Sequence, residues 1–158
     1  MKPQAQAAEL GYSQVLWLFG EKEEITEVGA MNVFFLIANK ETGRPELITA
    51  PLTRGHILPG VTRDSILHIA RTKWSDDLDV IEKSPTMPEI QEAAEDGRLL
   101  EAFGAGTAAV VTPISCIHYK GKDVDIPATG KLTMQIWDEI IGIQYGKIEG
   151  PDGWSVEI

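Results

Sequence analysis

The stretch Ile57–Leu67, ILPGVTRDSIL, places Pro and Gly directly before a helical apolar pattern. The first turn of a helix exposes backbone N–H groups and positive dipole potential, and Gly60 has no side chain to keep an anion away. The dipole contributes only about 0.3 to 1 kcal/mol, so phosphate binding there needs further donors. The stretch predicts an anion at this helix start, although the same composition is also typical of an ordinary loop.

A second candidate is Phe103–Val110, FGAGTAAV. Its glycines permit close backbone approach, and Thr107 offers a hydroxyl beside the N–H of Ala108. A dinucleotide-binding fingerprint has a strand before its glycines and a helix after them. Here we expect a helical segment over 98–103 and a strand over 108–114, which excludes a Rossmann site. A tight turn packed against a helix is the alternative interpretation.

The third candidate is Glu27, which lies among Ile25, Val28 and Met31 in ITEVGAMN. If this segment is buried sheet, the carboxylate requires a donating or cationic partner, either an arginine or a cationic ring nitrogen. Strand alternation could instead expose it to solvent, and both interpretations stay open.

The elements that must position these residues follow from hydrophobic periodicity and turn residues. We expect helices after Gly60, after the capping-box pair Thr86 and Glu89, and over Leu132–Ile143. Strands are expected over 14–19, 25–40 (a pair or one bent strand), 47–52 and 108–114, with a hairpin turn at 120–123. Because strands and helices interleave, the fold class is α/β or α+β.

Composition limits the partners. A chain of 158 residues fits a single domain, 1–158, and its net charge of −10 disfavours nucleic acid and anionic membranes. The three His lack helical zinc spacing and the single Cys116 cannot form an internal disulfide, so we expect no metal and a reducing compartment. No apolar stretch is long enough to cross a bilayer. We expect a cytoplasmic protein that binds a small molecule.

Four ordered motifs together resemble the branched-chain amino-acid aminotransferases, fold-type-IV pyridoxal-phosphate enzymes, and particularly their fungal members. The motifs are LWLFG…ITEVGAMNVFF, ITAPL…ILPGVTRDSIL, EAFGAGTAAVVTPI and IQYGKIEG…W, between Gln4 and Trp154. The resemblance implies the C-terminal large domain of that fold, a mixed sheet or pseudo-barrel with flanking helices.

The resemblance also implies roles for single residues. Glu27 would pair with the pyridine nitrogen of the cofactor and keep the ring protonated. Val61 and Thr62 would hold the cofactor phosphate through their backbone N–H groups, together with Thr107. The substrate side would be bordered by three small residues: Ala30, Gly106 and Ala108.

The chain departs from the family pattern at the lysine that binds the cofactor. Relatives carry a Schiff-base lysine shortly before an Asn-Tyr pair, upstream of where this chain begins, and Lys2 lacks that context. By the same comparison with the family pattern, we expect these residues to lack the small N-terminal domain. The other lysines are expected in polar turns or on solvated faces. Ala30 replaces a family threonine, and Ala109 and Thr112 replace the CxxC motif of mammalian relatives, so thiol control is not expected.

Three functions follow as alternatives. The chain is a lysine-free protein that binds pyridoxal phosphate non-covalently without turnover, half of a split aminotransferase, or a domain repurposed for cofactor-independent isomerisation or cyclisation. Transamination requires an amine that holds the cofactor and shuttles a proton, so we expect no unaided transamination. We also expect a homodimer or a hetero-partner that covers the face left open by the missing domain.

Overall fold

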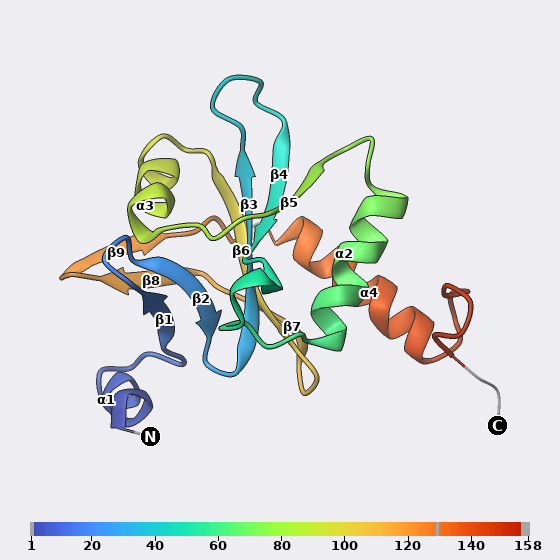
Figure 1. The fold of residues 1–158 in the computed structure, drawn as a ribbon, viewed down its shortest axis with the longest axis horizontal. Helices are drawn as coiled ribbons and strands as arrows, with labels where there is room; N and C mark the ends of the chain where they lie inside the picture. Colours follow the sequence, from blue (N-terminus) through green and yellow to red (C-terminus); the bar gives the residue numbers. More distant parts are fainter. Residues whose placement is uncertain (1, 129, 156–158) are drawn as a thin grey trace.

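The computed structural model describes residues 2–128 and 130–155. In this part of the chain a seven-stranded sheet stands at the centre, with helices on its faces and a two-stranded ribbon beside it (Figure 1). The elements are α1 (Lys2–Glu9), β1 (Leu16–Phe19), β2 (Glu24–Val28), β3 (Met31–Ala38), β4 (Pro45–Thr49), the 3-10 helix η1 (Leu52–Arg54), α2 (Val61–Lys73), β5 (Asp79–Glu82), α3 (Met87–Glu95), β6 (Leu99–Gly106), β7 (Val110–Pro113), β8 (Cys116–Tyr119), β9 (Lys122–Asp125) and α4 (Lys131–Gln144).

Strand β3 is the centre of the sheet. Its residues 32–37 pair with β6, while β2 pairs with its first residues and β4 with the residues from Phe34 onward. All these pairs are antiparallel, whereas β4 and β5 are parallel. The sheet is therefore mixed and the fold is α+β, as the sequence predicts.

Alternating side chains of β3 build two cores, because successive residues of a strand point to opposite faces. Phe34 and Leu36 pack in the core that contains the apolar faces of α2 and α4. Val33 and Phe35 pack in the core that contains α3 and the β8–β9 ribbon. The sheet is covered on both faces, which explains the nearly continuous apolar run in β3.

Three local predictions are confirmed. Thr86 caps α3, and Glu89 completes the capping box. The β8–β9 hairpin turns at Lys120 and Gly121, both with positive φ. Helix α4 buries its predicted apolar face: Leu132, Ile136, Ile140 and Ile143.

The prediction of a helical segment over 98–103 is wrong. Leu99–Gly106 is strand β6, which pairs with β3 on one side and β7 on the other. An apolar run buried on both faces lacks strand alternation, so periodicity cannot separate it from a helix. Strand β5 was not expected at all, since its four residues become strand only through pairing with β4.

Candidate functional site

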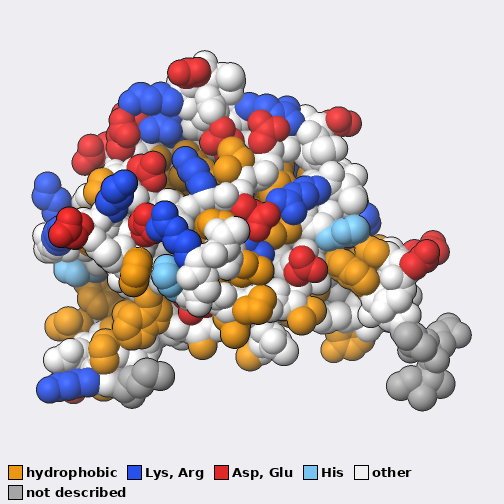
Figure 2. Space-filling view, viewed as in Figure 1, with side chains coloured by type: hydrophobic (Ala, Val, Ile, Leu, Met, Phe, Trp, Pro, Cys, Tyr) orange, Lys and Arg blue, Asp and Glu red, His pale blue; other side chains and the backbone are white. Residues whose placement is uncertain are grey.

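The three candidate stretches approach the same end of the sheet. The β2–β3 turn at Gly29 and Ala30, the β6–β7 turn at 107–109 and the start of α2 all lie at the lower end in Figure 1. Figure 2 shows hydrophobic side chains gathered along this lower edge, while charged side chains cover the upper part. The two ends of the sheet therefore offer different chemistry.

Glu27 lies in β2, opposite Trp17 of β1 and Asn32 of β3. Its side chain is half-buried, and Oε1 accepts a hydrogen bond from the N–H of Leu58 at 3.0 Å. Among residues 2–128 and 130–155, no Lys or Arg lies within 4.0 Å of this carboxylate, and no donor contacts Oε2. The expected donating partner is thus a peptide group, and one oxygen remains available to a further donor.

Helix α2 begins without a side chain that accepts from its first N–H groups. Its N-cap is Gly60, which offers no such group, and the first backbone bond of the helix runs from Asp64 N to Gly60 O at 3.0 Å. Val61 at the helix start is 82% exposed. Unpaired N–H groups and positive dipole potential at an exposed helix start suit an anion.

The β6–β7 turn is closed by the pair Gly106 and Val110, with Thr107, Ala108 and Ala109 exposed at its tip. Val110 has φ 59°, a left-handed conformation that costs a non-glycine residue about 1–2 kcal/mol. Its side chain is buried in the core beside α2 and α4, which offsets this strain. The turn is therefore held by the core and presents the Thr107 hydroxyl outward.

Met31 gives the glycines of β6 a packing role. A Cβ on Gly104 would lie 2.9 Å from Met31 Cε, and a Cβ on Gly106 would lie 3.0 Å from Met31 Cγ. A side chain at either position would require Met31 to move, because Met31 lies directly against β6.

Sequence reasoning missed Asn32. Its side chain is 5% exposed, and Nδ2 donates to the carbonyl of Leu58 at 3.0 Å. The signal was present in the sequence, because Asn32 is a polar residue in the apolar run MNVFFLIA, and a buried amide must be hydrogen-bonded.

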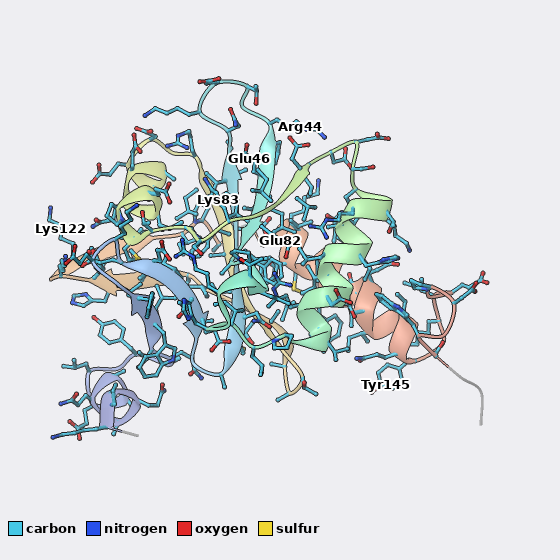
Figure 3. The ribbon with its side chains drawn as sticks, in the orientation of Figure 1. Arg44, Glu46, Glu82, Lys83, Lys122 and Tyr145 are labelled. Atoms are coloured by element: carbon cyan, nitrogen blue, oxygen red, sulfur yellow. The ribbon has the colours of Figure 1, made fainter. Side chains whose placement is uncertain are left out.

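Arg63 was also missed. This arginine is buried, and Nη2 donates to the carbonyl of Ala50 and to Glu82 Oε1 at 2.6 Å. Arg71 donates to the other oxygen of Glu82, and hydrogen bonds from Arg71 and then Arg63 lower the pKa of Glu82. Figure 3 shows Glu82 at the end of β5, just before Lys83 in the segment that leads to α3. The two ion pairs tie the first and the last turn of α2 to the sheet.

The lysines lie where the sequence predicts. All of them are exposed: Lys2, Lys22, Lys40, Lys73, Lys83, Lys120, Lys122, Lys131 and Lys147. Hydrogen bonding to Glu92 raises the pKa of Lys40, so that amine stays protonated. In the described part of the chain, no group of three or more metal-ligating side chains occurs, and no helix has the length and apolarity to cross a membrane.

The chain is similar in sequence to known proteins. The family described as amino-transferase class IV matches residues 1–117. The mitochondrial branched-chain-amino-acid aminotransferase of Saccharomyces cerevisiae is 51% identical, over 92% of this chain and 38% of the relative. The cytosolic enzyme of the same yeast is 49% identical, over 97% and 42%.

A solved structure shares the fold. The branched-chain amino acid aminotransferase from Thermobaculum terrenum, in its PLP form, superposes with a TM-score of 0.69 at 32% identity, over 92% of this chain and 41% of that protein. The chain thus spans about 40% of the length of the relatives it matches. A match over most of the 158 residues, joined to the same fold, settles the family. The chain belongs to the class IV aminotransferases.

Proposed function

We propose that this chain holds the ring and phosphate of pyridoxal phosphate at the lower end of its sheet, as part of a branched-chain amino-acid aminotransferase. The observation that carries the proposal is the hydrogen bond between Glu27 and Leu58. It places a carboxylate with a free oxygen directly beside the loop that starts α2. One ligand with a cationic ring nitrogen and a phosphate can therefore satisfy both groups.

The residues fit the chemistry of that cofactor. Glu27 Oε2 has no donor among the described residues, and a half-buried carboxylate favours a cationic partner. The first N–H groups of α2 and the hydroxyl of Thr107 are donors of the kind a phosphate requires. When bound, pyridoxal phosphate supplies the electron-accepting ring on which amino groups are exchanged.

The roles of the chain's own residues follow. Glu27 holds a proton at the ring nitrogen, and the N–H groups of Val61 and Thr62 hold the phosphate together with Thr107. On the substrate side, the N–H of Ala108 binds a carboxylate, and Ala30 and Gly106 border the aliphatic part of the amino acid. The names of the yeast and Thermobaculum relatives support branched-chain substrates.

Amino-group exchange is not expected from these 158 residues alone. All the lysines of this chain are exposed to water, whereas an amine that carries a cofactor and shuttles a proton lies inside the site. The proton-shuttling amine must therefore come from outside these residues, either from further chain or from a second polypeptide. A cofactor site without turnover is the alternative that the same observations support.

Cofactor binding is tested by titrating the protein with pyridoxal phosphate and following absorbance. We expect saturable binding that Glu27→Ala weakens at least tenfold, about 1.4 kcal/mol. Glu46→Ala is the matched control, because this carboxylate lies on β4 at the upper end of the sheet and accepts from Asn39. Equal weakening by both variants would contradict the site.

The missing amine is tested by borohydride reduction followed by mass spectrometry. We expect no pyridoxyl adduct on any specific lysine of this chain. Activity toward a branched-chain amino acid and a keto acid should appear only after a lysine-bearing segment of the yeast relative is added. Activity of the purified chain by itself would refute this part of the proposal.

Association and location are further parts of the proposal. An apolar groove of about 630 Å³ lies between α1, β1 and β8, and Leu10 and Phe19 are exposed nearby. These surfaces support a homodimer or a hetero-partner, and light scattering that finds only monomer at high concentration would contradict it. A cytoplasmic location also stays a proposal, since the yeast relatives include a mitochondrial and a cytosolic enzyme.

A further inference from the structure

We propose that Asn32 is a positioning residue, which joins the ring-nitrogen contact to the phosphate contact by fixing the peptide groups of Leu58. The role of this clamp in cofactor binding rests on the function proposed above. The clamp consists of Glu27, Asn32, Leu58 and Gly60. Asn32 itself need not touch the cofactor.

Side chains from two neighbouring strands, β2 and β3, both form hydrogen bonds with the backbone of Leu58. Glu27 and Asn32 are directly opposite one another in β2 and β3, so their side chains project from the same face of the sheet. Glu27 Oε1 accepts from Leu58 N, and Asn32 Nδ2 donates to Leu58 O, both at 3.0 Å. The peptide groups on both sides of the Leu58 Cα are therefore fixed to the sheet.

From Leu58 to the helix start, the chain has little freedom. The N–H of Gly60 donates to Leu58 O at 2.8 Å, and the intervening Pro59 has a fixed φ. Gly60 is the N-cap of α2, whose first bond runs from Asp64 N to Gly60 O. Fixing Leu58 therefore fixes the direction of the N–H groups of Val61 and Thr62.

Asn32 also explains the glycine in this loop. Gly60 has φ −69° and ψ 134°, an extended conformation that any residue adopts, so backbone freedom does not require glycine here. A Cβ at this position would lie 2.4 Å from Asn32 Oδ1, far inside contact distance. Gly60 is needed because the buried amide of Asn32 occupies that space.

The amide of Asn32 has little room to move away. Its side chain is 5% exposed, and its backbone is paired with both Glu27 of β2 and Ala105 of β6. Leu58 O keeps its bond from Gly60 when Asn32 is shortened, so the carbonyl does not become an unsatisfied buried acceptor. Loss of the amide should therefore change the position of the loop more than the stability of the fold.

The first experiment measures inorganic phosphate binding by calorimetry in wild type, Asn32→Ala, Glu27→Ala and the double variant. We expect each single variant to weaken phosphate binding about tenfold, although neither side chain touches the phosphate. The double variant should be within about twofold of the single ones, because both act through Leu58. Single variants that bind phosphate as wild type does would overturn the proposal.

The second experiment needs no ligand. Gly60→Ala is expected to lower the unfolding midpoint in wild type and to have less than half that effect in the Asn32→Ala background, where Oδ1 is gone. Equal losses in both backgrounds would overturn the clamp. If Asn32→Ala does not fold, Asn32→Ser replaces it, since its hydroxyl is too short to reach Leu58 O.

The two experiments separate the clamp from the proposed function. If wild type binds neither phosphate nor pyridoxal phosphate, the proposed function fails, and the Gly60 comparison alone decides whether Asn32 holds the loop. If wild type binds phosphate but the Asn32 and Gly60 variants act independently, the site stands and the clamp is refuted.

Discussion

Helices α2 and α4 pack on the same face of the sheet, yet their N-termini are satisfied differently. Each begins after a glycine that provides no side-chain cap, Gly60 and Gly130. At α4, the buried carboxylate of Glu101 accepts from Leu132 N and Thr133 N at 2.9 Å. At α2, no described side chain does so, and the helix starts at an exposed residue. The fold places a buried carboxylate at the N-terminus of α4, whereas the first N–H groups of α2 have no side-chain acceptor among residues 2–128 and 130–155.

The position of each helix relative to the sheet explains the difference. Glu101 lies in β6, which is paired with β3 and β7, and is 4% exposed, so it meets α4 inside the core, where an unpaired carboxylate would be costly. Helix α2 begins at the lower end of the sheet, where Val61 in its first turn is 82% exposed. Helix α3 shows a third arrangement, in which the local pair Thr86 and Glu89 suffices.

The largest effect is expected from Glu101→Ala. Two backbone donors and the hydroxyl of Thr133 lose a buried acceptor, so the free energy of unfolding should fall by about 3 kcal/mol. Urea denaturation measures it. Glu101→Gln, which retains one acceptor oxygen, is the control and should lose less. A change below about 1 kcal/mol would show that α4 does not depend on this cap.

A carboxylate introduced into the first turn of α2 should compete with bound phosphate. Thr62→Asp places a carboxylate in the first turn, which should stabilise the helix by about 0.5 kcal/mol at low salt. It should weaken inorganic phosphate binding about tenfold, because like charges repel. Thr62→Asn has similar shape without the charge and should bind phosphate as wild type does. Unchanged phosphate binding in the Asp variant would place the anion elsewhere.

The locally capped helix is expected to be less sensitive than α4. Thr86→Ala removes one half of the capping box and should lower the free energy of unfolding by about 1 kcal/mol. Thr86→Ser keeps the oxygen and should be nearly neutral. If Thr86→Ala lowered the free energy of unfolding as much as Glu101→Ala does, burial of the capping group would not explain the difference between α3 and α4.

The smallest effect concerns the attachment of α2 to β5 and depends on pH. Arg71 and then Arg63 lower the pKa of Glu82 from its ordinary value of 4.5, so its ion pairs stabilise the fold above that pH and are lost as the pH falls through the lowered pKa. Glu82→Gln should cost under about 1 kcal/mol at pH 7, since the carboxylate is partly exposed. The difference in the free energy of unfolding between wild type and Glu82→Gln should shrink as the pH falls, because wild type loses the same ion pairs. A difference that grows in acid would contradict the stabilising role given to these ion pairs.

Much of the site could be predicted because its parts are local in sequence. The Pro-Gly start of α2, the turn at Thr107 and the carboxylate Glu27 each carry a recognisable local pattern, and their combined order indicated the family that residues 1–117 match. The roles predicted for these residues remain proposals. Asn32 and Arg63 were missed because a buried polar residue reveals its partner only when two distant segments meet.

The sequence by itself determined the helix starts, the turns and the alternating apolar faces, since these depend on neighbours within a few residues. Only the tertiary structure decided that Leu99–Gly106 is a strand and that Glu101, rather than a local residue, caps α4. The same holds for the clamp on Leu58, whose two partners lie more than 25 residues away along the chain. The physical reason is that a strand buried on both faces and a cap supplied from another element are defined by pairing across the fold, which local periodicity does not encode.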